Sequence, residues 1–132
     1  MLPLLGPIRD AVSAPVAALP VPYRTDDAEP SFQSLTDPAC DCIPGERPFP
    51  TALDPFTCNR YELGEFARAA HELGVRYLGV CCGAGPHHIR AVAEALGRTP
   101  RASRYSPDMS RHAFLGTSQD LKQRNLDYAS RL

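Results

Sequence analysis

The 132-residue sequence predicts an α/β fold, and the pattern of its second half is the main reason. There, runs of β-forming residues alternate with amphipathic helical patterns, and the connections between them are short. This alternation implies parallel strands joined by right-handed crossovers. The prolines add a division of the chain, because eleven of the 14 lie between Pro3 and Pro55. The first half is therefore expected to be irregular and the second half regular.

The N-terminal half contains three predicted segments. Apolar residues at helical spacing predict the last part of a helix over Met1 to Val12, interrupted at Gly6 and Pro7. Pro15 to Tyr23 is a short apolar run bounded by turn residues, which is typical of a buried strand. Arg24 to Thr57 keeps no periodic pattern, and we expect a long loop that covers a functional site.

The second half contains two helices and one strand. Asn59 is placed to cap a helix that ends at Gly74, and its apolar stripe consists of Leu63, Phe66, Ala67, Ala70 and Leu73. A strand is expected over Val75 to Val80. The next helix ends at Gly97 and places Ile89, Val92, Ala93 and Leu96 on one face. Beyond Thr99 we expect a loop to about residue 116 and a short helix with Leu121, Leu126 and Tyr128.

Composition and charge exclude several classes of function. The formal net charge is −1, and the basic residues are scattered among acidic ones, so nucleic acid is not an expected partner. No apolar run is long enough to cross a membrane, and the first residues lack the pattern of a signal peptide. We therefore expect a cytoplasmic protein. Its five cysteines are then expected to be thiols, ligands or nucleophiles rather than disulfides.

The clearest chemical motif is Cys81-Cys82-Gly83-Ala84-Gly85, which stands where a strand ends and a helix begins. In parallel α/β folds, active sites gather at that end of the strands. Two thiolates are good zinc ligands, but adjacent strand residues point to opposite faces, so both sulfurs reach one ion only if the backbone leaves the regular pleat. Gly79 and Gly83 provide that freedom. The alternative is one core cysteine and one spare thiol.

Other cysteines and histidines are weaker candidates for ligands. His87 and His88 follow the motif, but neighbouring helix residues diverge by roughly 100°, so we expect one histidine to hydrogen-bond at the helix start instead. Cys40 and Cys42 lie in the proline-rich loop, and Cys58 precedes the Asn59 cap. Without a matching second pair, these three are expected to be ordinary thiols.

Several segments together resemble the homocysteine S-methyltransferase family. Gly74 to Leu96 resembles the end of its barrel, where the last strand leads into a Gly-x-Cys-Cys-Gly motif followed by P-x-H-I-R. Further segments resemble the betaine-homocysteine methyltransferase branch: Ala17–Thr25, Phe32–Leu35, Leu53–Pro55, Arg60–Glu62 and Ser106–Ser110. The resemblance covers nearly the whole chain. It implies methyl transfer from an onium donor such as betaine to the thiol of homocysteine, giving methionine.

The resemblance also implies a fold and a metal. The fold is an eight-stranded β/α (TIM-type) barrel, of which residues 1–98 would form about the last two β/α units and residues 99–132 an irregular C-terminal extension. Cys81 and Cys82 match two of three cysteine ligands of a zinc ion, and Gly83 matches the small residue that follows them. The third cysteine belongs to an Asn-Cys motif that would precede Met1. No further catalytic or cofactor-binding residue is transferred to this chain.

The resemblance therefore predicts a C-terminal fragment that is inactive alone. A truncated gene, a late start assignment or a split chain would each produce it, and we expect truncation. The partners would be homocysteine and a small methyl donor, with a homo-oligomer or an N-terminal part completing the barrel. Two other functions remain open. One is a small zinc-stabilised interaction module that recruits Cys40, Cys42 or a histidine, and the other is a redox protein that uses the Cys81–Cys82 pair.

Overall fold

The structure, a computed structural model, describes residues 1–39 and 44–131. Contacts within the chain separate two units, Met1–Pro100 and a second unit that starts at Arg101. Among the described residues, no helix has the length and apolar character needed to cross a membrane.

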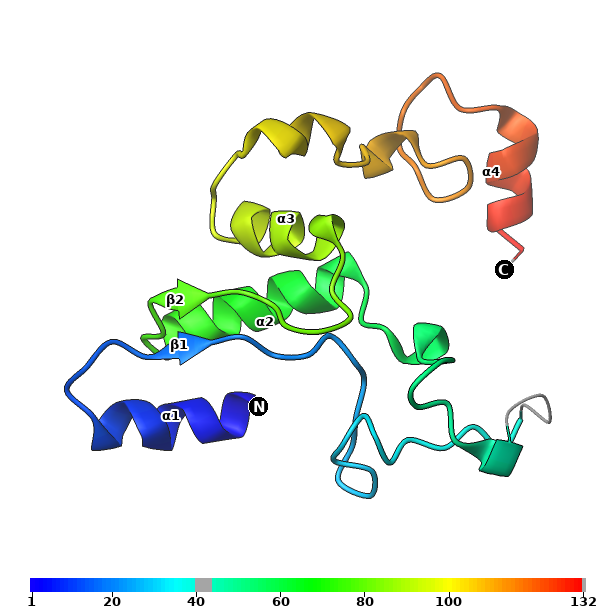
Figure 1. The fold of residues 1–132 in the computed structure, drawn as a ribbon. Coiled ribbons are helices and arrows are strands. Elements are labelled where there is room, and N and C mark those ends of the chain that lie inside the picture. Colours follow the sequence, from blue (N-terminus) through cyan, green and yellow to red (C-terminus); the bar gives the residue numbers. More distant parts are fainter. Residues whose placement is uncertain (40–43, 132) are drawn as a thin grey trace. The chain divides into compact units, whose positions relative to one another are not determined.

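The first unit contains helices on a small parallel sheet (Figure 1). Its elements are α1 (Leu2–Ala11), β1 (Ala17–Ala18), the 3-10 turns η1 (Pro44–Glu46) and η2 (Asp54–Phe56), α2 (Arg60–Glu72), β2 (Tyr77–Leu78) and α3 (Pro86–Ala95). The two strands pair in parallel, with Ala17 opposite Tyr77 and Ala18 opposite Leu78. The predicted α/β order and the parallel pairing are thus confirmed. These two strands do not by themselves make up an eight-stranded barrel.

The regular strands are shorter than the runs that the sequence predicts. β1 occupies two residues of the expected Pro15–Tyr23 run, because the prolines in that run have no N–H to donate to a neighbour. Hydrogen bonds nevertheless continue past the strand ends, from Gly79 N to Ala18 O (3.0 Å) and from Cys81 N to Pro20 O (2.8 Å). The two chains therefore stay paired as far as the cysteine motif.

The helix α2 carries the best-defined local signals. Asn59 caps it by accepting from Tyr61 N and Glu62 N, and the Glu62 side chain accepts from Asn59 N, which completes a capping box. The predicted stripe is buried at Leu63, Ala67 and Ala70, whereas Phe66 is partly buried and Leu73 is exposed. Gly74 follows with a φ of +90°, as a helix C-terminus requires.

The sheet has one covered face and one open face. Val16 and Ala18 are buried in an apolar cluster with Leu5 of α1 and Ala70 of α2, and Leu78 packs against it. On the other face Leu19 is 45% exposed and Tyr77 65% exposed. Figure 1 shows α1 beside β1, and α3 lies along α2. The helices of this unit thus cover only one face of the sheet.

One prediction for the N-terminal half needs correction, and another is confirmed. The interruption predicted at Gly6 and Pro7 is absent, because α1 continues through Pro7 to Ala11. The predicted long loop is confirmed for the described residues of 24–57, in which the short turns η1 and η2 are the elements, and its two ends lie side by side. Tyr23 forms an antiparallel bridge with Thr57, and Arg24 N donates to Phe56 O.

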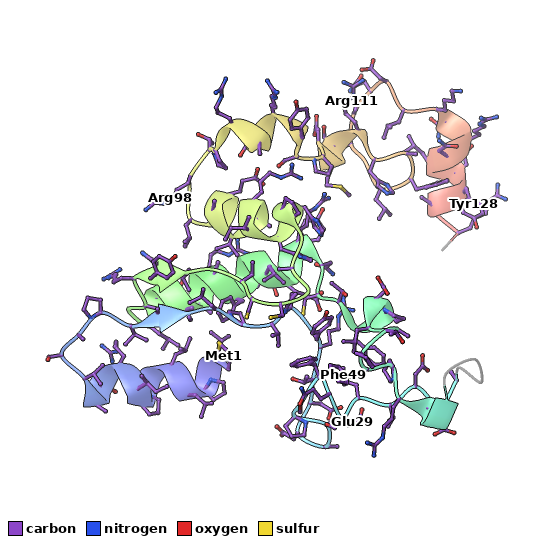
Figure 2. The ribbon with its side chains drawn as sticks, viewed as in Figure 1. Met1, Glu29, Phe49, Arg98, Arg111 and Tyr128 are labelled. Atoms are coloured by element: carbon purple, nitrogen blue, oxygen red, sulfur yellow. The ribbon has the colours of Figure 1, made fainter. Side chains whose placement is uncertain are left out.

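The second unit is built from short turns and one helix. It contains η3 (Arg101–Tyr105), η4 (Met109–Arg111) and α4 (Gln123–Ala129), so the predicted short C-terminal helix is confirmed. Ring contacts connect Phe114 with His112 and with Tyr128 of α4, which is labelled in Figure 2. The division into units falls after Pro100, whereas the sequence prediction places the end of the barrel part at residue 98, and that assignment stays a prediction.

Candidate functional site

The cysteine motif forms a tight turn between β2 and α3. Ala84 N donates to Cys81 O at 3.2 Å, so Cys81 to Ala84 make a four-residue turn in which Gly83 is the third residue. Gly83 has a φ of +85°, the value that a type II turn requires at that position. Both cysteines therefore lie beyond the regular pleat, as a shared ligand role would need.

The two sulfur atoms are close enough to bind one ion. Cys81 Sγ and Cys82 Sγ lie 3.6 Å apart, and both residues are exposed. Two sulfurs bound to one tetrahedral zinc at ~2.3 Å would be about 3.8 Å apart. The thiol pair thus fits two positions of a zinc site. Within residues 1–39 and 44–131, no cluster of three or more Cys, His, Asp or Glu side chains could hold a metal.

The freedom of this turn comes from Gly83, whereas Gly79 has a different role. Gly79 has no positive φ, and a Cβ there would lie 3.3 Å from Leu19 Cδ2, so Gly79 makes room for a side chain of the neighbouring segment. A Cβ on Gly83 would approach the Tyr23 hydroxyl oxygen closely enough to overlap it. The Tyr23 ring therefore lies directly against the turn.

Tyr23 also connects the turn with the long loop. Its ring stacks on Phe32 at a centroid distance of 5.4 Å, and Phe32 contacts Phe49 edge-on at 5.7 Å. Phe49 is labelled in Figure 2 on the loop that follows β1. Because β1 and β2 are parallel, this loop begins at the same end of the sheet as the cysteine turn. The loop that the sequence predicts over a functional site thus starts beside the cysteine turn.

An ion pair holds the start of the loop against α2. Arg24 Nε and one terminal nitrogen donate to the two carboxylate oxygens of Glu62, both at 2.7 Å. The arginine lowers the pKa of the Glu62 carboxyl, and its hydrogen bond is the largest cause. Arg24 also donates to Pro55 O at 3.3 Å, near the end of the loop. The two ends of the loop are therefore fixed beside the first turn of α2.

His88 is the buried polar side chain at this site, with 2% exposure. Gly85 N donates to His88 Nδ1 at 2.9 Å, and His88 Nε2 lies 2.9 Å from Cys58 O. The expectation that one histidine hydrogen-bonds at the helix start is thus confirmed for His88. His87 is exposed, and desolvation of its ring, together with the neighbouring His88 and Arg90, lowers the pKa of its imidazole. The histidines and the two cysteines do not form a four-ligand cluster.

Of the three remaining cysteines, Cys58 lies within the described residues, and the other two lie outside them. Cys58 is partly buried, and burial raises the pKa of its thiol, with a further increase from the Glu62 carboxylate. A raised pKa favours the protonated form of the Cys58 thiol, whereas the thiolate is the form that binds metals and acts as a nucleophile. The expectation for Cys40 and Cys42 lies outside the described residues.

Sequence reasoning missed two contacts of the site. The approach of Tyr23 to Gly83 joins residues 60 positions apart, and the bond from His88 to Cys58 O joins residues 30 positions apart. No periodic pattern signals either contact. The only available sign is that a glycine and a histidine follow the cysteine pair at positions where a turn and a helix start need them.

These features define a class of protein: a β/α layer with exposed thiols at the carboxyl ends of parallel strands. Comparison with known proteins narrows the class. The model of the homocysteine S-methyltransferase family matches residues 27–96, and the chain belongs to this family.

Individual relatives agree with this assignment. A betaine–homocysteine S-methyltransferase 1 of Xenopus tropicalis is 32% identical over 117 residues, covering 88% of this chain and 26% of the relative. That of Danio rerio is 43% identical over 88 residues (64% and 20%). An S-methylmethionine–homocysteine S-methyltransferase of Rattus norvegicus is 40% identical over 73 residues (55% and 20%). The chain thus spans about a quarter or less of these curated relatives.

Replacing Gly83 by alanine should destabilise the first unit more than the same change at Gly97. Both glycines have positive φ, but a Cβ at Gly97 meets nothing within 4 Å, whereas one at Gly83 meets the Tyr23 hydroxyl. We expect Gly97→Ala to cost ~1–2 kcal/mol and Gly83→Ala roughly 1–3 kcal/mol more. Urea unfolding followed by circular dichroism measures both.

The excess cost should disappear when Tyr23 is also replaced by alanine, because only the φ penalty then remains at residue 83. Equal costs for Gly83→Ala and Gly97→Ala in the parent chain would show that Tyr23 does not lie against the turn.

Proposed function

We propose that this chain provides the last two β/α units and two zinc-binding thiolates of a homocysteine S-methyltransferase. The observation that carries the proposal is the Cys81–Cys82 pair: two exposed sulfurs 3.6 Å apart, just past a parallel strand, in a member of this family. The proposed reaction moves a methyl group from an onium donor to the thiol of homocysteine and gives methionine.

In this proposal Cys81 and Cys82 hold the zinc ion as thiolates. The donor set fits, because zinc prefers sulfur ligands and the spacing is near the tetrahedral value. When bound there, zinc would keep a coordinated substrate thiol deprotonated at neutral pH. The exposure of both cysteines leaves room for a further protein ligand and for substrate. Gly83 provides the turn that directs the two side chains to one point.

The exposed surfaces of the first unit support its assembly into an eight-stranded barrel. The open face of the sheet carries Leu19 and Tyr77, which would point into a barrel interior. A groove beside β2 and α3 has a mixed lining, in which apolar residues such as Leu78 and Ile89 lie beside His71, Arg76 and Arg98. A neighbouring β/α unit would cover both surfaces and pair with the free edge of β2. Either a longer polypeptide or another subunit would supply it.

The donor class follows from the named activities of the relatives. One group of relatives is named for betaine, which is a quaternary ammonium compound. Another is named for S-methylmethionine, which is a sulfonium compound. In both cases the homocysteine sulfur would form a bond to the methyl carbon while the bond from that carbon to nitrogen or sulfur breaks. The positive charge of the donor is lost in this step, and the leaving group departs as a neutral amine or thioether.

Family membership favours this proposal over the two other functions considered. A structural zinc module would need a third and a fourth ligand, and His88 has both ring nitrogens engaged in hydrogen bonds. A redox protein would need a reversible Cys81–Cys82 disulfide, and that reaction gives no account of the family match over residues 27–96.

Zinc binding should depend on Cys81 and Cys82. We expect a Cys81→Ser, Cys82→Ser double variant to lose zinc affinity by roughly tenfold or more, because serine hydroxyls replace both sulfur ligands. Metal analysis and chelator competition measure the loss. Affinity in the parent chain should also fall as the pH is lowered, since protons compete for the thiolates.

The matched control for this variant is Cys58→Ser, because the Cys58 thiol is partly buried and protonated. It should bind zinc as the parent does. If the double variant retains the zinc affinity of the parent, the assignment of Cys81 and Cys82 as ligands is wrong.

Methyl transfer should require barrel elements that the relatives hold outside the matched part. We expect the 132-residue chain alone to form methionine from homocysteine and betaine or S-methylmethionine far below the common enzyme range of ~1 to 10³ per second. A chimera in which this chain replaces the matching part of the Danio rerio relative should be active, and inactive with Cys81→Ser. Full turnover by the isolated chain, or an inactive but folded parent chimera, would contradict the proposal.

A further inference from the structure

We propose that His88 is a positioning residue that fixes the cysteine turn by hydrogen bonds to Gly85 and to Cys58. The inference rests on the proposed function, because it concerns the thiol pair that would bind zinc. His88 contributes no ligand itself. It acts through the backbone of Gly85, just after the turn, and of Cys58, before α2, and this action is separable from the chemistry of Cys81 and Cys82.

The position of His88 in the fold makes it a link between two helix starts. It is the third residue of α3, and its own backbone N donates to Gly85 O at 3.0 Å. Its ring accepts from Gly85 N and reaches Cys58, the residue before the Asn59 cap of α2. A side chain that is 2% exposed at this place replaces solvent as the partner of two backbone groups.

The two contacts determine which ring nitrogen carries the proton. Nδ1 accepts from the amide of Gly85, so it has no proton. In the neutral ring the proton is then on Nε2, which donates to the carbonyl oxygen of Cys58. Both ring nitrogens are therefore engaged, and a buried polar group with both partners present avoids the cost of an unsatisfied one.

These bonds complete a circuit around the cysteine turn. Cys81 N donates to Pro20 O at 2.8 Å, and Cys58 N donates to Pro22 O at 2.7 Å, which fixes both residues to the segment after β1. Through the Cys58 carbonyl, His88 then connects this same segment to the far end of the turn at Gly85. Both ends of the turn are thus anchored to one segment.

The circuit matters because the thiols themselves are exposed. Both side chains are exposed, and their sulfurs contact each other. Their relative position is then set mainly by the backbone of the turn. Groups that orient ligands without binding the metal commonly change metal affinity by ~10–100-fold when they are lost. His88 is in a position to have this effect.

His87 provides a matched comparison within the same turn of helix. It is an exposed histidine whose ring centroid lies 3.9 Å from that of His88. A substitution at His87 therefore changes the same residue type at the same helix start, but it removes neither bond of the circuit. An effect that is specific to the circuit must appear at residue 88 and be absent at residue 87.

The test uses the full 132-residue chain and cobalt(II), whose thiolate complexes absorb visible and near-ultraviolet light. His88→Ala removes both bonds. His88→Asn places an acceptor near the Nδ1 position, and His88→Gln places a donor near the Nε2 position, so each keeps one bond. The controls are His87→Ala and the Cys81→Ser, Cys82→Ser double variant. Circular dichroism and urea unfolding measure the fold of each variant separately.

We expect His88→Ala to bind cobalt(II) about tenfold more weakly than the parent and to show an altered thiolate band at saturation. His88→Asn and His88→Gln should restore part of the affinity and of the band, and His87→Ala should match the parent. Where His88→Ala does not fold, the Asn and Gln variants decide the result, because each replaces only one contact.

Two results would overturn the inference, and they can be told apart from failure of the proposed function. Folded His88 variants with the affinity and spectrum of the parent would contradict it, and so would equal losses at His87 and His88. If these occur while the double cysteine variant loses cobalt(II), only the role of His88 is wrong. If the double variant binds as the parent does, or the parent binds no cobalt(II), the proposed metal site is wrong and this inference with it.

Discussion

The parallel pairing of β1 and β2 is the constraint on which the rest of the site depends. It continues past the regular strands to the bond between Cys81 N and Pro20 O, so both segments leave the sheet at the same end. The proline-rich loop and the cysteine turn consequently start side by side. Tyr23 can then lie against Gly83, and the Pro22 carbonyl can accept from Cys58 N. A short sheet thus assembles a site from residues more than 50 positions apart.

Contacts to the backbone of the turn, rather than contacts to the thiols themselves, hold the thiol pair in place. The positive φ of Gly83 forms the turn, and the Tyr23 ring occupies the space in which any larger residue would place its Cβ. His88 and the Pro20 carbonyl hold the two ends of the turn. This arrangement leaves both cysteines exposed, as the proposed zinc site shared with substrate requires. The open face of the sheet is consistent with a site that other barrel units complete.

The sequence predicts those features that depend on local chemistry. The sequence predicts the Asn59 cap, the glycine after α2 and the alternation of strand and helix, because each signal lies within a few residues of its effect. The length of each strand is not predictable from the sequence, since it depends on the hydrogen bonds to the partner strand. The contacts of Tyr23 and His88 were also hidden, because they join distant segments. The sequence predicts the cysteine pair as a site because it follows a strand. The 3.6 Å distance between the two sulfurs depends on the geometry of the turn, which the sequence does not show.

The central claim is that Cys81 and Cys82 together bind one zinc ion, and X-ray absorption at the zinc edge tests it most directly. The sample is a zinc-loaded variant in which Cys40, Cys42 and Cys58 are replaced by serine, so that the pair supplies the only cysteine sulfurs. We expect two sulfur neighbours at ~2.3 Å from zinc. A spectrum in which zinc has only oxygen and nitrogen neighbours would contradict it.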